Sequence, residues 1–118
     1  MVAATEIRLN KAERVLYVEF DDGSSYALPA EYLRVESPSA EVQGHAPDQR
    51  QTVAGKRLVA IIGVEPVGNY AVRLIFDDRH DTGIYSWEYL RELGHDYNTR
   101  WGSYLTALEV KGMNRDRG

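Results

Sequence analysis

Residues 76–91 read FDDRHDTGIYSWEYLR, and an earlier stretch, residues 20–34, repeats this pattern as FDDGSSYALPAEYLR. In each stretch Phe-Asp-Asp is followed by a turn, a strand with a tyrosine (Tyr26 and Tyr85) and Glu-Tyr-Leu-Arg, and one extra residue in the later turn aligns the two. Aspartate suits turns because its side chain accepts hydrogen bonds from the backbone that follows it. We interpret each stretch as a β-hairpin leading into a helix. The alternative interpretation is a paired functional surface.

The segments around the repeat add strands and one helix. Residues 4–9 and 15–20 are expected to be strands, and the apolar run 58–67 is expected to be a central strand paired with 70–76. Trp101, Tyr104, Leu105 and Leu108 follow helical spacing, which predicts a C-terminal helix with these four side chains on one face. The predicted fold class is therefore α+β: a mainly antiparallel sheet shared by two similar β-β-helix units, with an added C-terminal helix.

The domain is expected to span residues 1–113, with a polar, frayed tail at 114–118. Between the two units, residues 36–56 hold two prolines and few large apolar side chains, which indicates a long loop. A loop of this length in a compact domain is usually functional or mobile. Ser86 is a candidate N-cap for the second helix, and Gly94 is a candidate stop.

Composition and charge exclude several classes of protein. The 118 residues carry a formal net charge of −4, which disfavours binding to nucleic acid or to anionic membranes. The chain has no cysteine, so disulfides, thiolate zinc sites, cysteine-ligated iron–sulfur clusters and cysteine nucleophiles are ruled out. No signal peptide or membrane-spanning run is present in the sequence. We therefore expect a cytoplasmic protein.

Motifs for common catalytic sites are missing. The sequence has no phosphate-binding loop, no dinucleotide-binding glycine pattern and no Gly-x-Ser-x-Gly elbow. We therefore expect neither an enzyme nor a bound cofactor. His45, His80 and Asp78 are weak candidates for a metal site, with histidines in solvated turns as the alternative. Asp77, Asp78 and Asp81 lie next to His80 in sequence, so the pKa of His80 is expected to rise.

Aromatic residues gather near the second helix. Tyr85, Trp87 and Tyr89 fall within five residues, and Trp101 belongs to the last helix. Aromatic side chains commonly dominate the binding energy of protein interfaces. These four residues are therefore candidates for an interaction surface, and packing in the core is the alternative.

Two motifs resemble those of a known family. The strings LRVESPSAE at 33–41 and GIYSWEYL at 83–90 are similar to the gamma-butyrobetaine hydroxylase-like N-terminal domain family, and the resemblance extends from about Ile7 to Gly112. In gamma-butyrobetaine hydroxylase, a domain of this kind precedes a separate oxygenase domain and binds structural zinc through three cysteines and a histidine. The resemblance therefore implies that a zinc site could occupy the matching positions of this chain. The matching positions here are Ser37, Ser39, Val42 and His80.

Because the three cysteine positions hold other residues, we expect no bound zinc. The oxygenase domain is not present in this sequence either. Similar domains are appended to P-loop iron–sulfur carrier proteins, which implies an accessory role. The first hypothesis is thus a non-catalytic module that binds a protein partner. The alternatives are an iron- or zinc-binding accessory factor centred on His80, and a small-ligand binder with a pocket between the sheet and the helices.

Overall fold

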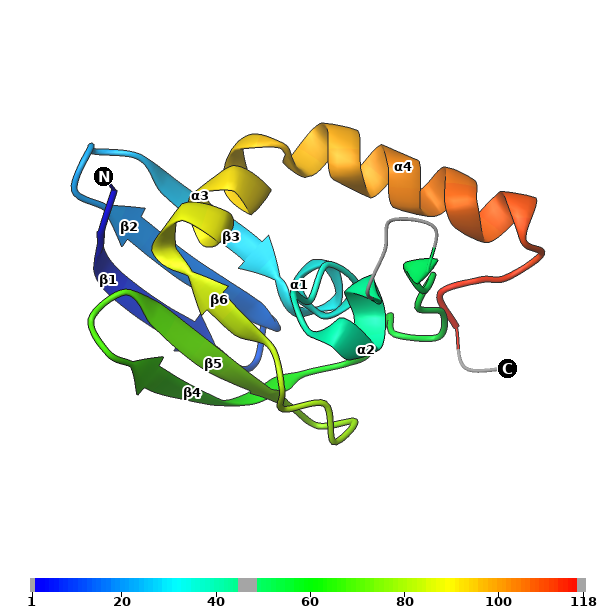
Figure 1. Cartoon of the computed structure of the whole chain (residues 1–118), viewed down its shortest axis with the longest axis horizontal. Helices are drawn as coiled ribbons and strands as arrows, with labels where there is room; N and C mark the ends of the chain where they lie inside the picture. Colours follow the sequence, from blue (N-terminus) through cyan, green and yellow to red (C-terminus); the bar gives the residue numbers. More distant parts are fainter. Residues whose placement is uncertain (1, 45–48, 117–118) are drawn as a thin grey trace.

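The computed structural model describes residues 2–44 and 49–116 of the chain. Figure 1 shows the strands gathered at one end of the molecule, with α4 extending away from them above α1 and α2. The α+β class is confirmed. The elements in chain order are β1 (Ala4–Asn10), β2 (Val15–Phe20), β3 (Ser25–Pro29), α1 (Ala30–Val35), α2 (Ala40–Gln43), β4 (Ile61–Val67), β5 (Ala71–Phe76), β6 (Ile84–Ser86), α3 (Trp87–His95) and α4 (Tyr97–Val110).

The strands form two antiparallel three-stranded sheets, β1-β2-β3 and β4-β5-β6. The two units therefore do not share one hydrogen-bonded sheet, which differs from the expectation. Each unit contains three strands and not two, so the repeated unit is β-β-β-helix. The first strand of each sheet carries an irregularity at the same place, between Ala4 and Glu6 in β1 and between Ile61 and Gly63 in β4. A β-bulge of this kind inserts one unpaired residue and bends the strand.

The turns of the two units match bond for bond. The amide of Phe20 donates to the carbonyl of Ser24 at 2.9 Å, and the amide of Phe76 donates to the carbonyl of His80 at 3.0 Å. In both turns, the second aspartate accepts a bond from the amide two residues later. The aspartates of the repeated motif therefore fix the turns, as their sequence predicts.

The third residue of α1 and the third residue of α3 make reciprocal bonds. The hydroxyl of Tyr32 donates to the carbonyl of Leu93 at 2.7 Å, and the hydroxyl of Tyr89 donates to the carbonyl of Glu36. Each tyrosine thus binds the C-terminal end of the other unit's helix. This exchange shows that an approximate twofold relation joins the two units.

The repeat corrects one sequence match. Leu28 pairs with Leu16 in the first sheet, and Tyr85 pairs with Val72 in the second. Since Leu16 and Val72 hold the same place relative to their Phe-Asp-Asp turns, the counterpart of Tyr85 is Leu28 and not Tyr26. Side chains of both sheets, α1 and α3 meet in one buried cluster that includes Leu28 and Tyr85.

Three other expectations need correction. β4 is an edge strand and not a central one, as suits a strand that contains Pro66, which has no amide hydrogen for a second neighbour. Leu105 is exposed, while Trp101, Tyr104 and Leu108 pack inward. The tail is held at residues 114–116, where Arg115 forms two hydrogen bonds with the buried Glu31. Residues 117 and 118 lie outside the described part of the chain.

No helix in the described part of the chain has both the length and the apolar character that a membrane span requires.

Candidate functional site

Of the four positions that the resemblance relates to a zinc site, Ser37, Ser39 and His80 lie in one hydrogen-bonded polar cluster, and Val42 is a buried apolar residue of α2. Ser37, Ser39 and Val42 come from the α1–α2 segment, and His80 comes from the turn after β5. The Oγ of Ser37 lies 2.8 Å from Nε2 of His80. We call Ser37, Ser39, Glu41, His80 and Thr82 the His80 cluster. Residues 36–44 of the predicted long loop therefore fold against His80.

The hydrogen bonds fix the tautomer of His80. Nδ1 of His80 lies 3.1 Å from Oε2 of Glu41, and an ionised carboxylate can only accept. Nδ1 therefore carries the hydrogen, and Nε2 accepts the hydroxyl hydrogen of Ser37. The Oγ of Ser39 meets the Oγ1 of Thr82 at 2.8 Å, so the second matched serine is also paired within the cluster.

This connectivity is that of a Ser-His-acid triad, but Ser37 has no access to substrate. Its side chain is fully buried, with 0% exposed surface, and it also accepts the amide hydrogen of Ser39. A nucleophilic serine must reach the carbon that it attacks. The arrangement is therefore suited to holding the α1–α2 segment on the second unit.

His80 differs from the exposed turn histidine that its sequence neighbours suggest, because only 4% of its surface is exposed. Burial, together with the nearby positive charge of Arg34, lowers the pKa of His80, and these effects outweigh the carboxylates of Glu41 and Asp78. The expected rise in pKa is therefore wrong. Burial disfavours the charged imidazolium, and the favourable interactions with the carboxylates of Glu41 and Asp78 are too weak to compensate for this effect.

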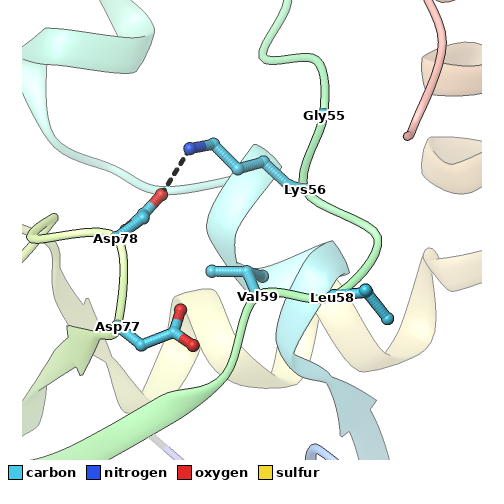
Figure 2. Close-up of a pocket in the computed structure, with 6 residues that line it drawn as sticks. All are labelled: Gly55, Lys56, Leu58, Val59, Asp77 and Asp78. Carbon is cyan, nitrogen blue, oxygen red and sulfur yellow. Dashed lines mark ion pairs between the residues drawn. The ribbon is translucent and has the colours of Figure 1, made fainter. Parts of the chain in front are cut away.

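Asp78, the second metal candidate, is occupied by cations. Figure 2 shows Lys56 reaching Asp78 across a small hollow of about 100 Å³, which Asp77 also lines. Lys56 Nζ and Arg34 Nε lie 2.6 and 2.8 Å from the same oxygen of Asp78. Burial alone would raise the pKa of Asp78, but bonds from Lys56, the His80 amide and Arg34 hold it below the usual value.

No metal site follows from these contacts. The structure shows no group of three or more potential ligands within residues 2–44 and 49–116. Both ring nitrogens of His80 already have hydrogen-bond partners. One carboxylate oxygen of Asp78 is already bound to Arg34 and Lys56. His45, the third candidate, lies outside the described residues. The absence of bound zinc stays a prediction.

The four aromatic candidates serve mainly in packing. Tyr85 is completely buried and so does not belong to a docking surface, while Tyr89 is tied to α1 through its hydroxyl. Trp87 is half-buried and donates to the carbonyl of Asn69. Trp101 stacks on Tyr97 at an interplanar angle of 7°. These aromatic rings pack where the two units and α4 meet. Their spacing in the sequence does not distinguish such packing from an exposed aromatic patch.

The low pKa of His80 predicts a loss of stability in mild acid. Below about pH 6.5, the unfolded chain takes up a proton at this position that the folded chain resists, so the free energy of unfolding decreases as the pH falls. We expect His80→Gln to reduce this decrease between pH 7 and pH 5. Urea unfolding at several pH values would measure it. Identical pH slopes for both proteins would contradict the lowered pKa.

Comparisons with known proteins agree with this fold. The model of the family described as "Gamma-butyrobetaine hydroxylase-like, N-terminal" matches residues 7–91. An NMR structure is 46% identical, with a TM-score of 0.84 and coverage of 98% of this chain and 91% of that one. A second NMR structure is 43% identical with the same TM-score, covering 98% of this chain and 86% of that one.

A crystal structure from Acidithiobacillus ferrooxidans is 44% identical, with a TM-score of 0.66 and coverage of 78% of this chain and 92% of that one. That protein is described as having unknown function and belonging to the DUF971 family. No curated protein matches the chain.

Proposed function

The chain belongs to the gamma-butyrobetaine hydroxylase-like N-terminal domain family, and from this premise we propose that it acts as a non-catalytic accessory module that binds a protein partner. The closed His80 cluster supports a structural role for the residues that would otherwise be the first catalytic candidates. The surface of the second unit supports the binding role.

The observation that carries the proposal is a difference between the outer faces of the two duplicated sheets. In the second sheet, three isoleucines occupy positions at which the first sheet carries small or polar residues. Ile84 pairs with Arg73, and Ile75 lies two residues farther along β5 on the same side, while Ile62 lies at the bulge. Ile62, Ile75 and Ile84 correspond to Thr5, Glu19 and Ala27 of the first unit.

Packing within the chain does not account for Ile62 and Ile84, whereas Ile75 is partly buried. Ile62 is 54% exposed at the bulge of β4, and Ile84 is 48% exposed in β6. Glu65 and Asp81 lie beside the isoleucines on either side of Arg73 and are half-exposed. The partner surface should therefore be apolar at its centre with basic side chains around it, because an interface matches both apolar area and charge.

The internal repeat supplies a matched test. We expect Ile84→Glu to abolish capture of a cross-linked partner, because a charge would enter an apolar contact, and to leave thermal stability nearly unchanged. Ala27→Glu, at the corresponding exposed position of the first sheet, should leave capture unchanged. Equal capture by both variants would contradict the proposal. If light scattering shows that the unsubstituted chain is a homodimer and that Ile84→Glu dissociates it, the partner is a second copy of this chain. That result would contradict the proposal of a different protein as the partner.

A further inference from the structure

The first sheet has a free edge at β1. β1 pairs with β2 on one side, and no other helix or strand of the described residues lies alongside it. Figure 1 shows β1, in dark blue, at the outer side of β2. A sheet edge presents amides and carbonyls that can pair with a strand of another chain. The backbone and the side chains of β1 indicate which strand that would be.

The alternation of an antiparallel sheet shows which backbone groups of β1 face the free edge. The amide of Phe20 donates to the carbonyl of Ser24, so Phe20 and the other even-numbered residues of β2 face β3. The odd-numbered residues of β2 therefore face β1, where their partners include Glu6 and Arg8. Ile7, which lies between these two partners, directs its own amide and carbonyl to the free edge.

The second sheet is closed at the corresponding edge. Pro66 in β4 pairs with Val72, and Leu9 in β1 pairs with Leu16, so Leu9 and Pro66 are counterparts in the repeat. A proline has no amide hydrogen to donate, and proline on an edge strand hinders pairing with a further strand. The seven residues of β1 include no proline. The first sheet can therefore accept a strand where the second sheet cannot.

The charges of β1 match those of a second, antiparallel β1. Glu6 and Arg8 flank Ile7, lie on the outer face of the sheet and are exposed. When Ile7 of one copy pairs with Ile7 of another, each Glu6 lies opposite an Arg8, and cross-strand pairs of opposite charge are stabilising. A shift of two residues in either direction places Glu6 opposite Glu6 or Arg8 opposite Arg8. One register is therefore favoured over its neighbours.

The same pairing offsets a repulsion inside the chain. Glu6 lies opposite Glu19 in the β1–β2 pair, and like charges in directly opposite positions are destabilising. An arginine from a second copy would lie beside Glu6 on its other side. Ile7 and Leu9 point to the inner face and are only partly buried, so a neighbouring strand would also cover part of their apolar surface.

We propose that the chain forms a symmetric dimer in which two β1 strands pair antiparallel about Ile7 and join the first sheets of both copies into one continuous sheet. This contact uses the same surface of both copies, as a twofold dimer requires. The paired segment is short, so we expect a weak dimer with a Kd on the order of 10 μM. The dimer goes beyond the partner binding proposed above, because Ile62 and Ile84 belong to the second sheet.

Sedimentation equilibrium of the intact chain tests the dimer, and exchange of charges tests its register. The unsubstituted chain should change from monomer to dimer as its concentration rises from about 1 to about 300 μM. Glu6→Arg and Arg8→Glu should each weaken association at least tenfold, because each places like charges opposite one another at two positions. The double variant with both substitutions should restore association. An equal mixture of the two single variants should form a heterodimer for the same reason.

Two controls separate this contact from other causes of association. Glu19→Arg makes the same change of charge on the same face but one strand away from the edge, so it should change the Kd by less than about twofold. Ile84→Glu should leave the dimer intact. A chain that stays monomeric at about 300 μM, a dimer that persists in both single variants, or a double variant that does not associate would overturn the proposal. Dissociation by Ile84→Glu would also overturn it.

Discussion

Replacement of Gly94 by alanine is expected to destabilise the domain by about 2 kcal/mol, although Gly94 lies inside helix α3. A Cβ atom at Gly94 would lie 2.3 Å from Cγ of Tyr26, near the root of that side chain. Tyr26 packs edge-on against Phe20, so its ring has little freedom to retreat. The missing side chain lets α3 lie directly on β3.

Thermal unfolding of Gly94→Ala should show a decrease in Tm of about 8 °C. The control is Gly102→Ala in α4, where an added Cβ meets no atom within 4 Å. Helix propensity favours alanine there, so this variant should gain as much as about 1 kcal/mol. The change in unfolding free energy is therefore expected to have opposite signs for Gly94→Ala and Gly102→Ala. A stabilised Gly94→Ala would show that Tyr26 and α3 are not in close contact.

Replacement of Asp78 by alanine is expected to destabilise the domain by about 3 kcal/mol. The carboxylate joins Arg34 and Lys56, and its side chain is only 13% exposed. Without it, the buried guanidinium of Arg34 loses its charged partner, and its Nη1 already has none among the described residues. A buried charge left without a partner is among the largest single causes of destabilisation.

The internal repeat again supplies the control. Arg91 bridges to Asp22 as Arg34 bridges to Asp78, at 2.7 Å, but on the exposed side of the molecule. Each aspartate also accepts the amide bond of its own turn, so Asp22→Ala removes an arginine bridge and a turn bond at an exposed site. Asp22 binds the hydroxyl of Ser24 where Asp78 binds Lys56. We expect a clearly smaller loss for Asp22→Ala in urea unfolding. Equal losses would show that burial of the Arg34 bridge contributes nothing.

Much of the fold could be predicted because its signals are local. Ser86 is the N-cap of α3, with its Oγ accepting the amide hydrogen of Tyr89, and Gly112 has the positive φ of a residue after a helix. Gly94 was expected to end α3, but the helix continues to His95. Its small size fits the contact with Tyr26, which lies far away in sequence, and local rules hold no information on such a contact.

The candidate site divides in the same way. The family resemblance identified Ser37, Ser39, Val42 and His80 as one set, and the structure joins Ser37, Ser39 and His80 through hydrogen bonds. Sequence did not find Glu41, which fixes the tautomer of His80, or the pairing of Glu36 with Arg50 and Arg100. Charged residues are frequent in every segment, so their spacing alone does not indicate which of them form pairs in the folded chain.

By itself, the sequence determined the fold class, the duplication and the turns, because these depend on short-range hydrogen bonding and on repeated patterns of apolar residues. Its resemblance to known motifs identified the family. Only the tertiary structure decided that the strands divide into two sheets, that Tyr85 is buried and that Ile84 is exposed. The physical reason is that burial depends on which surfaces meet. An isoleucine looks the same in the sequence whether it lies on the inner or the outer face of a sheet. Which face becomes buried is decided only when the second unit packs against the first.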